Sequence, residues 1–76
     1  SGYLLMMKNW DVPGIIGNIG SLMGKNNINI AAMVFGRKEA GGVAVSILNI
    51  DSPVSPELLE KIKKIENILE VKSIKL

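Results

Sequence analysis

Residues 9–17 read NWDVPGIIG, and this stretch decides the fold. It follows a short apolar run at residues 3–7 that has the composition of a β-strand, and it leads into apolar residues spaced as on one face of a helix. Pro13 suits the first turn of that helix because its missing N–H would have no partner there, and Asp11 or its neighbour can cap it. We therefore predict a strand, a polar loop and an amphipathic helix in direct succession.

The predicted helix contains three glycines, Gly17, Gly20 and Gly24. Each destabilises a helix by up to about 1 kcal/mol relative to alanine. Because a missing side chain permits close approach, we expect this helix to pack closely against a backbone or a ligand.

The rest of the sequence supplies three more strands and a second helix. Residues 28–35 are apolar except for Asn29, as expected of a strand that is covered on both sides or engaged by a partner. Residues 43–48 alternate as a third strand, and Ser55 and Pro56 open a helix as its cap and first residue. Residues 71–76 read as a last strand whose apolar residues fall on both faces, which requires a bulge or a two-sided environment.

The resulting order is βαββαβ. It predicts an α+β fold, the ferredoxin-like sandwich, in which a four-stranded antiparallel sheet carries two helices on one face. A chain of 76 residues has room for one small domain, so residues 1–76 are expected to form it alone.

Composition excludes several classes of function. The chain has no Cys and no His, so thiolate and imidazole chemistry are absent, and we expect no catalytic residue, no metal site and no cofactor. A net charge of +2 without a basic cluster, and a third strand without aromatic residues, argue against nucleic acid as a partner.

Localisation and association also follow from composition. No apolar run approaches the ~18 residues of a membrane span, and the first residues lack a signal-peptide pattern, so we expect a cytoplasmic domain without membrane contact. A mean hydropathy of +0.30 is high for so small a domain and indicates that some apolar surface meets another chain or domain.

Three segments together resemble a known family: residues 9–17, the run NINIA at residues 27–31, and GRKEAGG at residues 36–42. The chain resembles the ACT domains, small regulatory domains that sense small molecules. Among these it looks most like the C-terminal regulatory domain of bacterial D-3-phosphoglycerate dehydrogenases, while iron–sulfur L-serine dehydratases carry a similar domain.

The resemblance implies a function and a site. In the serine-regulated dehydrogenases, L-serine lies between two ACT domains, touching the first loop of one and the start of the second strand of the other. Those positions fall on Asn9, Asp11 and Asn29 here. The best-known members have His in place of Asn9 and Asn in place of Asp11. The parent would be an NAD-dependent dehydrogenase whose catalytic domain is absent from this chain.

The chemistry of these residues suits an amino acid. The backbone amides of Gly14 and Ile15 can hold a carboxylate at a helix N-terminus, and Asn9 and Asn29 can each donate to and accept from a hydroxyl. Asp11 accepts from an ammonium group or, alternatively, repels a ligand carboxylate. The competing interpretation is a ligand-free structural domain in which Asp11 is only a helix cap. In either case we predict a homodimer joined along the second strand, residues 28–35.

Overall fold

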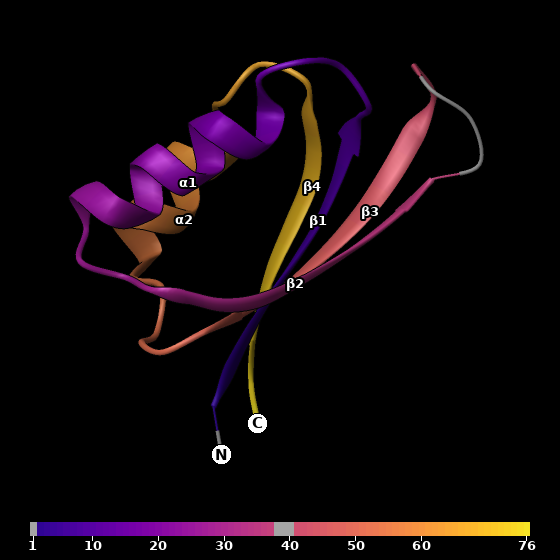
Figure 1. The fold of residues 1–76 in the computed structure, drawn as a ribbon. Helices are drawn as coiled ribbons and strands as arrows, with labels where there is room; N and C mark the ends of the chain where they lie inside the picture. Colours follow the sequence, from indigo (N-terminus) through magenta and orange to yellow (C-terminus); the bar gives the residue numbers. More distant parts are fainter. Residues whose placement is uncertain (1, 38–40) are drawn as a thin grey trace.

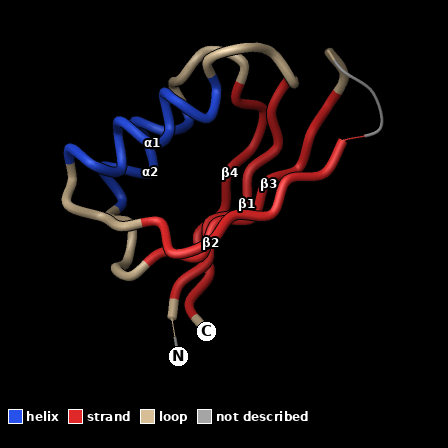
Figure 2. Tube along the Cα trace, in the orientation of Figure 1, coloured by secondary structure: helices blue, strands red, loops and turns tan. Residues whose placement is uncertain are grey.

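The computed structural model describes residues 2–37 and 41–76. The elements are β1 Tyr3–Trp10, α1 Ile15–Lys25, β2 Ile30–Arg37, β3 Val43–Ile50, α2 Pro56–Lys63 and β4 Ile68–Lys75. The chain forms one sheet with strand order β2-β3-β1-β4, in which every neighbouring pair is antiparallel, and both helices cover one face (Figures 1 and 2). This arrangement confirms the predicted ferredoxin-like sandwich.

The two ends of the sheet differ. The first and last described residues lie side by side at one end, where the N–H of Leu76 donates to the carbonyl of Gly2 at 2.9 Å. Strand β1 runs from there to the opposite end, where the chain turns into α1 (Figure 1). Strand β2 begins at the end that holds the termini, because Ile30 and Tyr3 both pair with Ile50.

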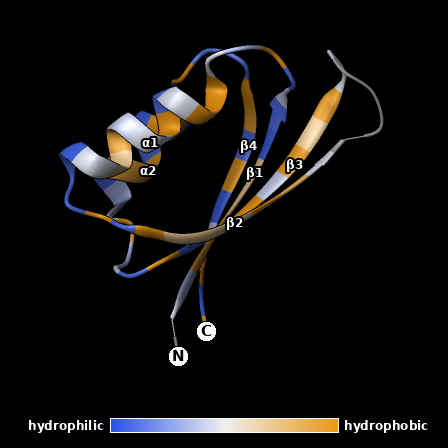
Figure 3. Cartoon of the chain, in the orientation of Figure 1, coloured by the Kyte–Doolittle hydropathy of each residue, from blue (hydrophilic) through white to orange (hydrophobic). Residues whose placement is uncertain are grey.

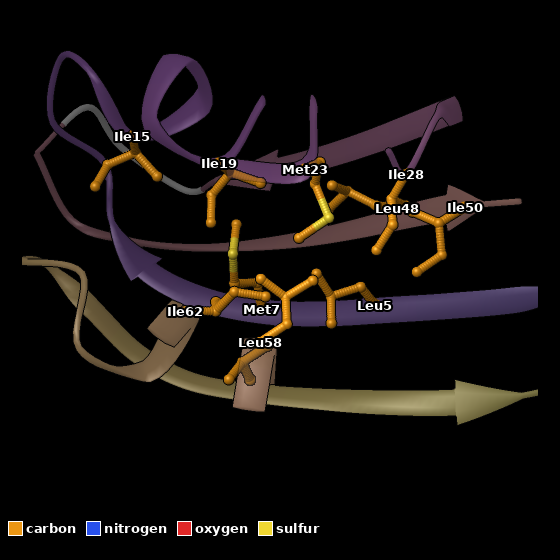
Figure 4. Close-up of a cluster of buried hydrophobic side chains, with 11 residues drawn as sticks. Leu5, Met7, Ile15, Ile19, Met23, Ile28, Leu48, Ile50, Leu58 and Ile62 are labelled. Atoms are coloured by element: carbon orange, nitrogen blue, oxygen red, sulfur yellow. The ribbon is translucent and has the colours of Figure 1, made fainter. Parts of the chain in front are cut away.

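The core lies between the helices and the inner face of the sheet. Alternate residues of β1 and β3 point inward, and one stripe of each helix faces them (Figure 4). Burial of these apolar side chains supplies the main driving force for folding. The labelled side chains that fill this layer are Leu5, Met7, Ile15, Ile19, Met23, Ile28, Leu48, Ile50, Leu58 and Ile62.

The two helices begin in different ways. Helix α2 is capped as the sequence predicted, with the N–H of Leu58 donating to the Ser55 hydroxyl at 3.1 Å and Pro56 in the first position. Helix α1 begins at Ile15, later than predicted, and its N-cap is Gly14 with a left-handed φ of 94°. The expectation that Asp11 or its neighbour occupies the cap position was wrong, because the N-cap is Gly14, whose missing side chain allows the left-handed turn without strain.

The glycines of α1 do not have the predicted role in the described structure. A Cβ atom built on Gly17, Gly20 or Gly24 meets nothing within 4 Å, and all three residues are exposed. The expectation of close packing was therefore wrong for contacts within the described residues. The glycines line the outer side of the helix, away from the core.

The apolar residues of β4 fall on both faces of the sheet because the strand has a bulge and also has a two-sided environment. The register slips once, since Lys8 pairs with Glu70 while Asn9 pairs with Ile68, so Leu69 is the extra residue of a bulge. Beyond the bulge, Val71 is buried against the helices, whereas Ile74 lies on the other face and is 41% exposed.

That other face of the sheet is not covered by helices in the described structure. Hydrophobic residues run along β2 and β3, while hydrophilic residues interrupt β4 (Figure 3). On the β4 side Glu70 lies 3.7 Å from Lys8 and 3.9 Å from Lys72, which makes a short charged row. The exposed large apolar residues of this open face are Trp10, Val34, Val43, Val45, Ile47 and Ile74.

Candidate functional site at the start of helix α1

Four of the five predicted site residues belong to one continuous segment, which runs from the end of β1 to the start of α1. Asn9 is near the end of β1, Asp11 follows it, Gly14 caps α1 and Ile15 is its first residue. The turn is fastened to the start of β3: the N–H of Asp11 donates to the carbonyl of Gly42 at 2.7 Å, and Gly41 donates to the carbonyl of Asp11 at 3.1 Å. The loop therefore has a fixed path where α1 begins.

The N-terminus of α1 offers donors for an anion. The first turn of a helix presents backbone N–H groups that have no intrahelical partner, and the helix dipole adds positive potential there. The N-cap residue, Gly14, makes no side-chain cap hydrogen bond, and the side chain of Ile15 is anchored in the core at 3% exposure. A small carboxylate suits this position because backbone N–H groups at a helix N-terminus can donate to it.

Asn9 is buried at 1% exposure on the inner face of β1. Its amide Nδ2 donates to the carbonyl of Trp10 at 3.0 Å, and its Oδ1 has no hydrogen-bond partner among the described residues. A buried acceptor without a hydrogen-bond partner lowers the stability of the fold and is uncommon in folded proteins, so Oδ1 of Asn9 stands out in this segment.

Ser46 of β3 is a second buried polar residue on the inner face of the sheet, close to Asn9, and the sequence interpretation did not single it out. It is completely buried, and its hydroxyl also lacks a partner within the described structure. The alternation of β3 could have revealed it, because Ser46 shares the inner face with Ala44 and Leu48.

Asn29 lies at the opposite end of the sheet. The backbone N–H of Asn29 donates to Oδ1 of Asp51 at 2.9 Å, and the backbone N–H of Asp51 donates to the carbonyl of Asn29 at 3.2 Å. Asn29 is exposed. Asn9 pairs with Ala44 and Ile30 pairs with Ile50, so about 20 Å of strand separates the two asparagines. One chain does not bring Asn29 to the other four residues.

Two further classes of site have no support in the described residues. They contain no group of three or more acidic, Cys or His side chains able to hold a metal ion. Nor is any helix in residues 2–37 and 41–76 long and apolar enough to cross a membrane.

The order of the elements and the antiparallel sheet define a small domain of the ferredoxin-like class. The family model of the ACT domain matches residues 4–67, so the chain belongs to the ACT domain family. ACT domains are regulatory modules rather than catalytic ones, and they generally bind amino acids and dimerise.

The chain is similar to parts of several metabolic enzymes. The chain is 48% identical over 75 residues to D-3-phosphoglycerate dehydrogenase of Methanocaldococcus jannaschii and 39% identical over 77 residues to that of Archaeoglobus fulgidus. These matches cover 99% of this chain but only 14% and 15% of the enzymes. A probable L-serine dehydratase beta chain of Bacillus subtilis is 28% identical over 84% of this chain and 29% of its own length.

Solved structures support the fold. The ACT domain from GTP pyrophosphokinase of Chlorobium tepidum superposes with a TM-score of 0.71, at 20% identity and 95% coverage of both chains. At this identity the similarity concerns the fold alone.

Proposed function

We propose that this chain is the amino-acid-binding regulatory domain of a cytoplasmic D-3-phosphoglycerate dehydrogenase and that its effector is L-serine. The similarity to D-3-phosphoglycerate dehydrogenases supports this choice of parent enzyme, and the start of α1 at Gly14, beside Asp11, is the observation that carries amino-acid binding. The domain itself performs no catalysis. It acts on the catalytic domain of the parent and not on nucleic acid or membrane.

The two charged ends of an amino acid have separate partners. The carboxylate sits at the backbone amides of Gly14 and Ile15, where the helix terminus favours negative charge. The ammonium group goes to the carboxylate of Asp11, because backbone hydrogen bonds hold this residue in the loop that leads to α1 and a carboxylate accepts from an ammonium group.

A second domain completes the site through β2. The two edges of the sheet differ in charge. Each edge strand has one register irregularity, but β4 also carries the charged residues Glu70, Lys72 and Lys75, whereas β2 has no charged residue from Ile30 to Gly36. Charged residues discourage pairing between sheet edges, and this part of β2 has none. Pairing of β2 with the same strand of a second copy therefore forms the homodimer.

This pairing also accounts for Asn29. A two-fold axis at the middle of β2 makes the paired strands antiparallel, so the start of one β2 lies beside the end of the other. The exposed side chain of Asn29 then reaches the end of the neighbouring domain that carries Asp11 and Gly14. An amino acid held there touches both domains.

Regulation follows from that position. A ligand that bridges two domains favours the arrangement in which they are paired, and it shifts the equilibrium only by its difference in affinity for the two arrangements. The catalytic domain of the parent senses this shift through its connection to the regulatory domain.

The competing proposals differ in the ligand and in the parent. A ligand-free dimerisation domain would use the same β2 edge, and it is favoured by the occupied amide of Asn9. The ACT domain of an iron–sulfur L-serine dehydratase would bind an amino acid in the same turn, and the B. subtilis relative favours it.

Isothermal titration of this chain with L-serine tests the proposal. Asp11→Asn is expected to weaken serine binding about three- to thirtyfold, because a charge-assisted hydrogen bond becomes a neutral one. Glu57→Gln removes the same charge from the exposed first turn of α2 and serves as the control, with unchanged affinity. Tighter binding by Asp11→Asn would show that Asp11 repels the carboxylate. Binding of no amino acid by the unmodified chain would leave the ligand-free dimerisation domain.

A further inference from the structure

We infer that two β2-paired dimers stack through the open faces of their sheets and form a tetramer. The inference rests on the homodimer of the proposed function and adds a second contact surface, which the amino-acid site does not use. It starts from the face of the sheet opposite the helices, where six large apolar side chains are exposed: Trp10, Val34, Val43, Val45, Ile47 and Ile74.

Apolar and charged residues occupy different parts of this open face. Residues 32–36 of β2 and residues 43–49 of β3 include no charged residue. On the β4 side, Lys8, Glu70 and Lys72 form a charged row. The apolar part therefore lies toward the β2 edge, and the charges lie toward the opposite edge (Figure 3).

Pairing through β2 joins two open faces into one surface. With a two-fold axis at the middle of β2, the strands of one copy run in the order β4-β1-β3-β2, and those of the second copy follow in reverse. The apolar parts then meet at the axis, and a charged row lies along each outer edge. A hydrophobic centre with a polar rim is the usual organisation of a protein–protein interface.

The size of this surface suits a stable contact. The exposed fractions of the six side chains correspond to about 400 Å² of apolar surface in one chain, which is ordinary for a monomer. The β2-paired dimer doubles this to about 800 Å², which is more than a monomeric protein usually exposes in one patch. Two such faces bury roughly 1,600 Å² when they stack, the size of a standard stable interface.

Symmetry makes a second dimer the best occupant of this surface. A single domain without internal symmetry can match only one half of a surface that has a two-fold axis at its centre. Another β2-paired dimer has the same axis, so both halves are matched at once, and the product is a tetramer with the common D2 symmetry. Stacked sheets lie about 10 Å apart with interdigitating side chains, which gives four layers in the order helix, sheet, sheet, helix.

Ile47→Lys tests this contact in sedimentation equilibrium. Ile47 is 39% exposed on β3 and pairs with Val34 of β2, so four copies of Ile47 lie near the centre of the stacked faces. The unmodified chain should form tetramers at about 100 μM, because interfaces of this size reach micromolar affinity or better. In the variant the dissociation constant between tetramer and dimer should rise at least about 100-fold, while the dimer remains.

Ile16→Lys is the matched control. Ile16 has nearly the same exposure, 41%, but it belongs to α1 and therefore lies on the other side of the sheet. This variant should retain the tetramer of the unmodified chain.

Trp10 gives a second measurement that needs no substitution. It is the single tryptophan of the chain and is 43% exposed on the open face. Its fluorescence emission should shift to shorter wavelength as tetramers form, with the same dependence on concentration as the sedimentation data. Pairing of β2 edges alone should leave the emission unchanged, because Trp10 belongs to β1, two strands from that edge.

The outcomes separate the stack from the β2-paired dimer. Dimers that neither associate further nor respond to Ile47→Lys would overturn the inference while pairing through β2 stands. Tetramers that persist in Ile47→Lys, or that form without a shift in Trp10 emission, would also overturn it, because their contact would lie elsewhere. Dimers that Ile47→Lys dissociates, or monomers at every concentration, would overturn both the stack and the β2-paired dimer.

Discussion

Replacing Val34 by lysine should separate the paired domains without unfolding them. Val34 lies near the middle of β2, and its side chain is 68% exposed in a single chain, so the fold does not depend on its burial. Burying a whole valine side chain contributes about 1.5–3 kcal/mol, and a facing strand would cover roughly half of the exposed part. Each of the two copies therefore loses about 0.5–1 kcal/mol on substitution.

The lysine adds repulsion across the two-fold axis. Like charges on facing strands are unfavourable by a further 0.2–1 kcal/mol or so, which brings the expected loss over both copies to about 1.2–3 kcal/mol of dimerisation free energy. The dimer dissociation constant should rise roughly 7- to 140-fold, since about 1.4 kcal/mol corresponds to a factor of ten. Sedimentation equilibrium over a concentration series measures this constant, and far-UV circular dichroism verifies the fold.

Val43→Lys is the matched control. Val43 is also exposed, at 44%, and lies on the same open face, but it belongs to β3 and pairs with Trp10 of β1 rather than with β2. The dimer dissociation constant of Val43→Lys should equal that of the unmodified chain. Equal dissociation constants for both lysine variants, or a stronger effect of Val43→Lys, would refute pairing through β2.

Two predictions concern the glycines of α1 and its cap. Gly20→Ala should raise the free energy of unfolding in urea by about 0.5–1 kcal/mol, because the added methyl group meets no neighbour and alanine favours the helix; a decrease would show that a second domain packs against this face. Gly14→Ala should lower the same quantity by about 1–2 kcal/mol, because φ is 94° and strain rather than contact opposes the methyl group; an unchanged value would contradict the assigned cap.

The order of elements could be predicted because each boundary has a local chemical signal. Ser55 and Pro56 began α2 as predicted, since a hydroxyl acceptor and a missing N–H act within one turn. The start of α1 was placed too early because Pro13 and Asp11 imitate a capped start, while the left-handed turn at Gly14 depends on how the loop is fastened to Gly41 and Gly42.

The site was less accessible to sequence interpretation because it combines separate strands. Asn9, Asp11, Gly14 and Ile15 are close in sequence and could be proposed together. The burial of Ser46 next to Asn9 depends on the register between β1 and β3, which no local pattern specifies. The distance of Asn29 from the turn likewise follows from the arrangement of the strands, and the proposed contact of Asn29 with the ligand therefore needs a second domain.

The central claim is that an amino acid binds at the start of α1 and touches two domains. Titration of the ¹⁵N-labelled chain with L-serine, followed by amide chemical shifts, tests it most directly. We expect the largest shift changes at the backbone amides of Gly14 and Ile15 and at the side-chain amide of Asn29, saturating together at one serine per chain. Saturable changes at the α1 turn without Asn29 would contradict the bridging of two domains, and shifts confined to the open face or to α2 would contradict the site itself.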